Sequence, residues 1–355
     1  MYVCILGGGL VSLTLAKALV NHGIYVDLFS NQKVNKINKS RTLGISKVNI
    51  DFFNKDVLDI KKLLWDIDKI EIYSENLKDE KILNFENYPK KLFSIIKNYD
   101  LYEYLISSLK KNKLFKLKKN NHTIVNKNYK LIINCDVNNF FTKKYFQKKI
   151  EKNYNSYAYT TIIDHKKLVK NNTAVQIFTK RGPLAFLPIS ESKTSIVYSA
   201  RGLEDVDLES LIQKHNTKYS IIKINQISNF KLNSVNLRTY YYKNILAFGD
   251  LLHKLHPLAG QGFNMSIRDI KLLVDLIKFR LNHGLELDNS ICQDFEKKTK
   301  HKNYLFSKGI DFVYEFFNLE SRIDNSLLSK SVQFFGKNKH ANKIFTKLAD
   351  NGIVI

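Results

Sequence analysis

The sequence predicts an α/β fold in which a doubly wound domain with a parallel sheet is interleaved with a second, mainly β-sheet domain. Three observations lead to this prediction. A strand–glycine turn–helix–strand unit fills residues 2–30, and a strand–loop–helix unit with closely spaced glycines follows much later, at 245–281. Between the two units, many short stretches alternate apolar and polar residues, which is typical of half-buried strands.

The first unit has the organisation of a Rossmann-like nucleotide-binding motif. Residues 2–6 are an apolar run, a glycine turn follows, a helical pattern extends to about residue 21, and 24–29 form a second apolar run. In such a βαβ unit the turn holds a pyrophosphate against the N-terminus of the helix. We therefore predict that Gly7 and Gly9 bind a dinucleotide.

Two positions of this motif depart from its usual pattern. Ser12 stands in place of the third glycine, and Ser30 stands where an acidic residue normally binds a ribose hydroxyl. A serine hydroxyl still forms hydrogen bonds, although weaker ones than a carboxylate. Both serines are included in the predicted site.

The second unit predicts the other half of a cofactor site. Residues 245–248 form a buried strand, and apolar residues at helical spacing predict a helix over 265–281. Asp250 follows the strand and can accept hydrogen bonds from sugar or ribityl hydroxyls. Gly260 and Gly262 lack a Cβ, so the backbone can approach a flat ring, and the helix start offers free N–H groups. The residues predicted here are Gly249, Asp250, Pro257, Gly260, Gln261, Gly262 and Asn264.

Together, the two motifs resemble the flavoprotein monooxygenases of the p-hydroxybenzoate hydroxylase type. The segment 255–264, Leu-His-Pro-Leu-Ala-Gly-Gln-Gly-Phe-Asn, is most similar to the ubiquinone-biosynthesis ring hydroxylases of that group. Three weaker patches agree in order and spacing: 40–46, the helix that contains Asn98, Leu101 and Leu105, and 182–188. The resemblance spans nearly the whole chain.

The resemblance implies FAD as cofactor, NAD(P)H as co-substrate, and O₂-dependent hydroxylation of a prenylated, phenol-type ring. It also implies that Arg41 lies near the flavin and that Leu184, Phe186 and Pro188 line the substrate pocket. His256 is a candidate catalytic residue, with a purely local hydrogen-bonding role as the alternative. No metal site is expected, because His253 and His256 lack further ligands at suitable spacing.

The resemblance further implies a discontinuous domain arrangement. The cofactor-binding domain would comprise 1–60, 98–150 and 235–284; the substrate sheet would comprise 61–97 and 157–231; and a helical region would fill 290–355.

One departure from the family concerns an Asp-Gly motif at the end of a central strand, implicated in both flavin and nicotinamide use. Here the strand 131–135 is followed by Asp136 and Val137, so the aspartate is present and the glycine is not. A β-branched residue rarely adopts positive φ. We therefore expect hydride delivery to be affected more than flavin binding. Two alternatives remain: another oxidase or reductase of the same fold acting on an isoprenoid, or a flavoprotein scaffold that has lost catalysis.

Composition constrains the partners and the location. The formal net charge is +24 over 355 residues, but nearly all of the 57 basic residues are lysines scattered along the chain, without a nucleic-acid motif. Nucleic-acid binding is therefore not expected, whereas attraction to an anionic membrane surface is consistent with the charge. The three scattered cysteines and the lack of a basic segment before the first apolar run favour the cytoplasm.

The C-terminal region contains apolar residues at helical spacing. They are explained either as ordinary core or as a surface that docks on the inner face of the membrane or on other quinone-biosynthesis proteins. These residues are Leu305, Phe306, Ile310, Val313, Phe316 and Phe317, followed by Leu327, Leu328, Val332, Phe334 and Phe335.

Overall fold

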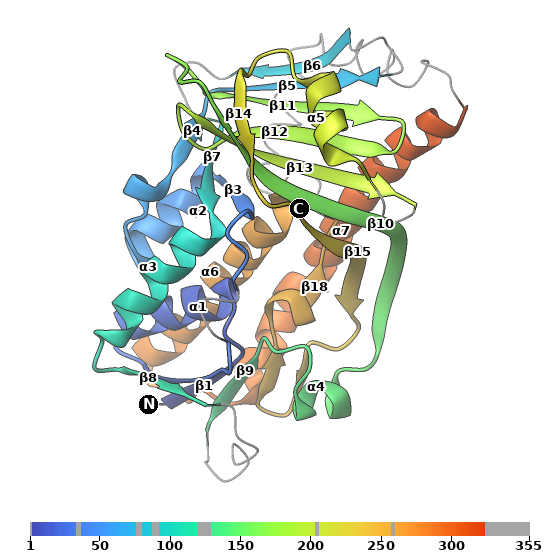
Figure 1. The fold of residues 1–355 in the computed structure, drawn as a ribbon. Helices are drawn as coiled ribbons and strands as arrows, with labels where there is room; N and C mark the ends of the chain where they lie inside the picture. Colours follow the sequence, from blue (N-terminus) through green and yellow to red (C-terminus); the bar gives the residue numbers. More distant parts are fainter. Residues whose placement is uncertain are drawn as a thin grey trace.

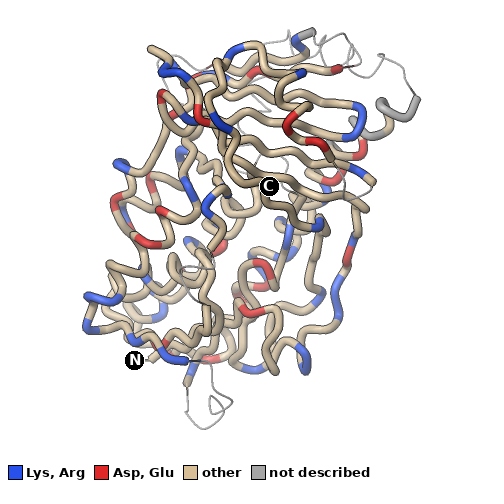
Figure 2. The backbone as a smooth tube through the Cα atoms, viewed as in Figure 1, with Lys and Arg blue, Asp and Glu red and all other residues tan. Residues whose placement is uncertain are grey.

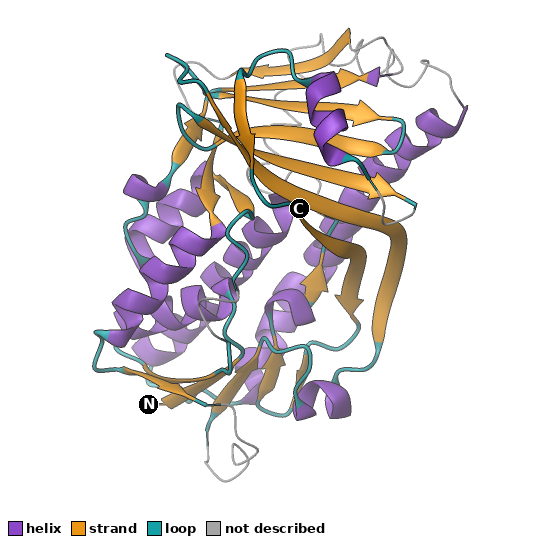
Figure 3. Ribbon diagram, viewed as in Figure 1, coloured by secondary structure: helices purple, strands orange, loops and turns teal. Residues whose placement is uncertain are grey.

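The computed structural model describes residues 2–32, 37–75, 80–86, 92–119, 129–202, 206–256 and 260–323. A six-stranded sheet lies at one end of the molecule and a nine-stranded sheet at the other, with helices between and beside them (Figures 1 and 3). Within these ranges, no helix combines the length and apolarity needed to cross a bilayer.

The six-stranded sheet is the doubly wound part of the fold. Its order is β16-β17-β9-β1-β2-β8, and every neighbouring pair except β16–β17 is parallel. The central strands are buried on both faces, as expected for parallel strands covered by helices. The strands are β1 (Tyr2–Leu6), β2 (Tyr25–Phe29), β8 (Phe115–Lys118), β9 (Leu131–Asn134), β16 (Tyr241–Tyr242) and β17 (Ile245–Ala247).

Four longer helices pack around this sheet, and α1 contacts both α3 and α6. They are α1 (Leu10–Asn21), α3 (Asn98–Lys110), α6 (Gln261–Asn282) and α7 (Asn289–Ile323). Two short elements lie at the ends of sheet strands: α4 (Phe140–Tyr145) and a 3₁₀ turn, Gly249–Leu251.

The nine-stranded sheet runs in the order β18-β15-β10-β13-β12-β11-β5-β6, with β14 paired to β10. Helix α5 (Leu208–His215) covers one face and buries Leu208 and Ile212 against it. The strands are β5 (Lys69–Ser74), β6 (Glu80–Glu86), β10 (Lys149–His165), β11 (Thr173–Thr179), β12 (Gly182–Pro188), β13 (Lys193–Arg201), β14 (Ile221–Ile224), β15 (Ser228–Leu237) and β18 (His253–Lys254).

A three-stranded antiparallel sheet connects the two parts. It contains β3 (Thr42–Ser46), β7 (Phe93–Lys97) and β4 (Trp65–Ile67). Between β3 and β4 the chain forms helix α2 (Lys47–Phe52) and two short helical turns, Phe53–Val57 and Lys61–Leu63. Because β3 pairs with β7, the predicted domain boundaries at residues 60 and 97 cut through this sheet. Strand pairing therefore does not follow those two boundaries, and 324–355 of the predicted helical region lie outside the described residues.

Helix α6 begins earlier than the sequence predicts. It starts at Gln261 rather than near 265, because polar and glycine residues of its first turn give no apolar periodicity. Strand β10 extends over Lys149–His165, and its first part pairs with β15.

The hairpin between β11 and β12 generates a stability prediction. Gly182 has φ +141°, and a Cβ there would lie 1.9 Å from the Ser199 carbonyl oxygen. Gly182→Ala should therefore lower the free energy of unfolding by about 3 kcal/mol. The matched control is Gly309→Ala in α7, where a Cβ meets nothing within 4 Å. That change should raise the free energy of unfolding by about 0.5–1 kcal/mol, and urea denaturation of both variants measures the contrast. Equal effects would contradict this interpretation.

Candidate functional site

The carboxyl ends of the parallel strands bring the predicted turn residues together. Gly7 has φ +109°, and a Cβ there would lie 3.2 Å from the carbonyl carbon of Cys135, at the end of β9. Burial, together with the nearby carboxylates of Asp250 and Asp136, raises the pKa of the Cys135 thiol to about 12. Asp250 itself is exposed, immediately after the β17 strand. Residues from β1, β9 and β17 therefore meet at one edge, as in dinucleotide-binding sheets.

The middle glycine of the first turn was not singled out in the sequence. A Cβ on Gly8 would lie 2.0 Å from the Ser30 hydroxyl oxygen, whereas Gly9 has open space around it. Ser30 accepts a hydrogen bond from the Gln32 backbone N–H (3.0 Å), and it lies beside the turn as predicted. Ser12 is buried in the first turn of α1 next to Cys135, so its side chain faces the sheet.

The start of α6 forms the second half of the site. Gly260 has φ +64°, and a Cβ there would lie 3.3 Å from the Gly44 nitrogen, so α6 begins directly against β3. Around Gly262 the corresponding position is open. The Gln261 side-chain oxygen is buried without a hydrogen-bond partner within the described ranges. A helix start with free N–H groups, open space and an unpaired acceptor is suited to a polar ligand.

Asn264 has a different role from the one predicted. Its Oδ1 accepts hydrogen bonds from the Ser46 N–H (3.0 Å) and the Asn49 side chain (2.8 Å), and its Nδ2 donates to the Gly44 oxygen (2.9 Å). The residue is almost completely buried. Since the protein itself occupies its hydrogen-bonding positions, a direct cofactor contact is not supported, and Asn264 instead holds α6 against β3.

The predicted strain at Val137 is absent. Among the described residues, the non-glycine residues with positive φ are Asn155 and Lys243, so Val137 has an ordinary backbone conformation. Asp136 caps its own turn, because its Oδ1 accepts from the Asn138 N–H (2.9 Å). The turn has therefore adapted to valine, and the predicted effect on hydride delivery loses its structural reason.

Arg41 lies where the two sheets approach each other. The following residue, Thr42, contacts Ser195 of β13 through a hydroxyl pair 2.9 Å apart, and Ser40 approaches Thr160 of β10 (3.2 Å). The Arg41 carbonyl accepts from the Asn98 N–H (3.0 Å), and its side chain is exposed. No hydrogen bond or ion pair fixes the guanidinium within the described residues, so a place for Arg41 near a flavin stays a prediction.

The predicted substrate-pocket residues lie on the face of the sheet that α5 covers. Leu184 and Phe186 are buried with Leu208 and Ile212 of α5, on the side away from the cofactor edge. Pro188 shares this face because side chains alternate along a strand. Alternation along a strand defines two faces but does not say which one a neighbouring element covers.

The opposite face is the one that looks toward β3 and α6. Ser195, which contacts Thr42, pairs in register with Leu187, and Val197 pairs with Ala185. Leu187 also packs with Ile67 and Ile95 of the three-stranded sheet. Ala185, Leu187 and Val197 are only half-buried. This face of β12 and β13 therefore carries the smaller, half-buried side chains.

His256 lies inside the protein. It is 0% exposed, the Tyr314 ring lies 4.2 Å from its ring, and the Tyr154 ring meets it edge-on at 4.9 Å. Burial, assisted by the nearby Lys152, lowers the pKa of His256 to about 3, so the ring is neutral. Neither ring nitrogen has a hydrogen-bond partner among the described residues. Neither a catalytic role nor local hydrogen bonding of His256 is therefore supported. The next predicted site residue, Pro257, lies outside the described residues.

Helix α7 buries a polar stripe in addition to apolar residues, and Phe306 and Ile310 pack with Leu255 and Met265 as ordinary core. Asn303 donates to Asp269, which pairs with His253 (2.5 Å); Ser307 accepts from Asn236 (2.9 Å). Further along the helix, Tyr154 donates to Asp311, and Tyr314 pairs with Ser156 (2.9 Å). Of the predicted apolar residues, Phe306 is buried and Leu305, Ile310 and Phe316 are half-buried. The side chains of Val313 and Phe317, and all of the later residues, lie outside the described set.

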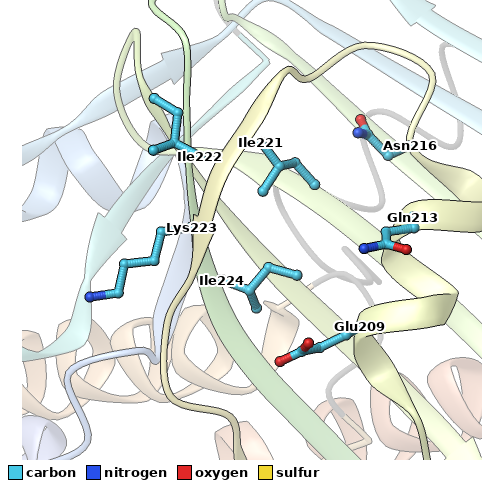
Figure 4. Close-up of a pocket in the computed structure, with 7 residues that line it drawn as sticks. All are labelled: Glu209, Gln213, Asn216, Ile221, Ile222, Lys223 and Ile224. Atoms are coloured by element: carbon cyan, nitrogen blue, oxygen red, sulfur yellow. The ribbon is translucent and has the colours of Figure 1, made fainter.

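A pocket of about 440 Å³ lies elsewhere, between α5 and β14 (Figure 4). Its lining residues are Glu209, Gln213, Asn216, Ile221, Ile222, Lys223 and Ile224. Since α5 covers the face opposite Ala185, this pocket is separate from the cofactor edge.

Comparison with known structures identifies the class of fold. Residues 201–284 match the family model of an FAD-binding domain. The p-nitrophenol 4-monooxygenase PnpA of Pseudomonas putida superposes with a TM-score of 0.77 at 12% identity, covering 99% of this chain and 98% of that one. HpxO of Klebsiella pneumoniae, solved with FAD and uric acid, gives 0.75 at 9% identity over 98% and 97% of the chains. The fold is therefore that of the FAD-dependent monooxygenases of the p-hydroxybenzoate hydroxylase type.

Relatives in sequence indicate which of the proteins with this fold the chain resembles. The ubiquinone biosynthesis monooxygenase COQ6 of Schizosaccharomyces pombe is 23% identical over 274 residues, 63% of this chain and 57% of that protein. The Dictyostelium discoideum COQ6 is 23% identical over 94% of this chain and 87% of its own length. The 3-demethoxyubiquinol 3-hydroxylase of Escherichia coli is 27% identical over 40% and 39%. These matches support the FAD-dependent ubiquinone-biosynthesis hydroxylase family, and the resemblance predicted from the motifs is confirmed.

The buried histidine generates a prediction on pH. An unfolded chain protonates His256 below about 6.5, whereas the folded protein keeps the ring neutral to about 3. Stability should therefore fall as the pH decreases through this window. Between pH 7.5 and pH 5 the native protein should lose about 2 kcal/mol more than His256→Phe, which cannot titrate. Urea denaturation at both pH values measures the difference, and identical pH slopes would show that His256 is not the group responsible.

Proposed function

We propose that this protein is an FAD-dependent hydroxylase that uses NAD(P)H and O₂ to hydroxylate a prenylated, phenol-type ring in ubiquinone biosynthesis. The observation that supports it most directly is that the first glycine turn and Asp250 meet at the carboxyl ends of β1, β9 and β17. The second glycine turn starts α6 against β3, which the inner face of β12 and β13 also approaches. The chain spans only about half of the first curated relatives' lengths, 57% and 50%, so the activity is inferred from this geometry together with the family.

The residues present fit FAD. Gly7 and the open position of Gly9 would receive the pyrophosphate, and the exposed Asp250 would accept hydrogen bonds from the ribityl chain. The N–H groups that begin α6, with the unpaired Gln261 oxygen beside them, would hold the polar edge of the ring. When bound, FAD supplies the redox and oxygen chemistry that no side chain provides. The protein contributes binding, orientation and a fixed electrostatic environment.

The substrate would lie against the inner face of the nine-stranded sheet. Ala185, Leu187 and Val197 are small or aliphatic and only half-buried, and the Ser195 and Ser199 side chains add polarity on the same face. An apolar wall with a few polar groups suits an aromatic ring with a prenyl tail. Because that tail partitions into a bilayer, we propose that the enzyme works at the inner face of the membrane or beside other quinone-biosynthesis proteins.

Isotope labelling tests the reaction. FAD-loaded protein is incubated with NADH or NADPH, ¹⁸O₂ and a short-chain prenylated phenol, and the products are identified by mass spectrometry. We expect one ¹⁸O atom per hydroxylated ring and nicotinamide oxidation stimulated by the phenol. Oxidation of the substrate without ¹⁸O incorporation would identify an oxidase, and the absence of any phenol-dependent reaction would support a scaffold.

Asp250 allows a direct test of cofactor binding. Asp250→Ala should raise the Kd for FAD about tenfold or more, because a charged acceptor is lost from the exposed strand end, while the free energy of unfolding stays unchanged. Asp275→Ala, at an exposed position on α6, is the matched control and should leave the Kd within about twofold. Fluorescence titration with FAD measures both. Unchanged affinity in Asp250→Ala would remove the residue from the site.

The two faces of β12 give a paired prediction. Ala185→Phe places a large ring on the inner face and should lower phenol turnover at least about tenfold, with FAD affinity retained. Phe186→Leu alters the neighbouring residue on the α5 face and should cost about 1–2 kcal/mol of unfolding free energy without changing KM. The reverse pattern, with KM altered only in Phe186→Leu, would place the substrate on the other face.

A further inference from the structure

A continuous row of aromatic rings lies at the surface formed by α4 and β16. The ring centres of Phe140 and Phe141 are 5.9 Å apart, those of Phe141 and Tyr145 are 6.4 Å apart, and Tyr145 stacks on Tyr242 at 3.9 Å with an interplanar angle of 10°. Phe140 is 55% exposed and Tyr242 39% exposed. The turn just before α4 adds Val137, 47% exposed. We call these residues the α4 surface.

Lysines are interleaved with the rings. The Lys144 ammonium lies 5.4 Å from the ring centres of both Phe140 and Tyr145, and Lys243 lies 5.7 Å from that of Tyr242. Lys143 is exposed on the same helix. No ion pair with an acidic residue is found for these three lysines within the described ranges. Figure 2 shows α4, near the lower edge, with its lysines in blue. The rings therefore form an apolar surface with unneutralised positive charge.

Neither core packing nor a solvated surface accounts for this arrangement. A core would bury the rings, yet two of them keep a large exposed fraction. Single exposed aromatic residues are common, but contiguous apolar patches bordered by polar groups mark interaction sites. Aromatic rings and lysines together are the composition found at membrane interfaces, where rings lie at headgroup depth and ammonium groups meet phosphates.

We propose that the α4 surface docks on an anionic lipid bilayer. The charge complementarity is specific: three lysines without acidic partners face outward on a protein with a net charge of +24. A second copy of the chain is a poorer occupant, because a two-fold interface would bring the lysines of one copy against those of the other. The choice of a bilayer rests partly on the proposed function, since the proposed substrate resides there.

Co-sedimentation of the full chain with vesicles tests the proposal. The vesicles contain equal parts phosphatidylcholine and phosphatidylglycerol, with pure phosphatidylcholine as the uncharged comparison. We expect salt-sensitive binding only to the anionic vesicles. Phe140→Ser with Tyr242→Ser, and separately Lys144→Gln with Lys243→Gln, should each weaken binding about tenfold.

Matched controls separate this surface from general charge and hydrophobicity. Phe279→Ser removes an aromatic side chain that is 57% exposed on α6, and Lys271→Gln removes an exposed charge from the same helix. Both should leave vesicle binding within about twofold. Phe312→Ser tests α7, where that ring is 69% exposed. If only Phe312→Ser weakens binding, or if the native protein does not bind anionic vesicles at low salt, the proposal is wrong.

Failure of this proposal is distinguishable from failure of the proposed function. The α4-surface variants should keep their FAD affinity and their ¹⁸O incorporation into a short-chain, water-soluble phenol. Vesicle binding without hydroxylation would overturn the reaction and leave the surface intact. Hydroxylation by a native protein that does not bind anionic vesicles would overturn the docking proposal and leave the proposed reaction intact.

Discussion

The side-chain amide of Asn264 joins segments more than 200 residues apart, and the geometry of the cofactor edge depends on it. One amide satisfies Gly44, Ser46 and Asn49 at once, so the start of α6 is held against β3 and α2. At Gly260 the backbone of α6 comes so close to β3 that a Cβ would lie 3.3 Å from the Gly44 nitrogen, which leaves little space for a side chain there. A buried amide with all its partners present specifies a single arrangement, since any displacement leaves several buried groups unpaired.

Polar contacts also determine how α7 is seated. Its buried stripe contacts strands β10 and β15 and, through Asp269, reaches His253 of β18, three residues before His256. An apolar stripe tolerates sliding along the helix axis, whereas hydrogen bonds at successive turns fix the register. The helix thereby determines the position of the strand that enters the cofactor loop, although it contributes no residue to the loop itself.

The sequence was informative where backbone geometry imposes a residue type. The glycine turns, Asp250 and the strand–helix order followed from spacing, because few residues tolerate the conformations required there. The sequence did not predict which face of β12 packs under helix α5. Alternation defines two equivalent faces until the position of that helix is known. The polar stripe of α7 has the same pattern as a solvated helix face, and only its burial in the fold reveals its role. The constraint on Gly8 could not be predicted from its own segment, because it comes from Ser30, which follows the end of β2.

Strand β10 sets a mechanical condition on any exchange of small molecules. It rises from beside α4 and is hydrogen-bonded on one side to β13 and on the other to β15 over most of its 17 residues (Figure 1). Both ladders lie within the nine-stranded sheet, so they hold β10, β13 and β15 together as one unit. Displacing one of these strands alone would break a ladder, so the inner face of the sheet keeps its shape while loops and side chains beside it rearrange.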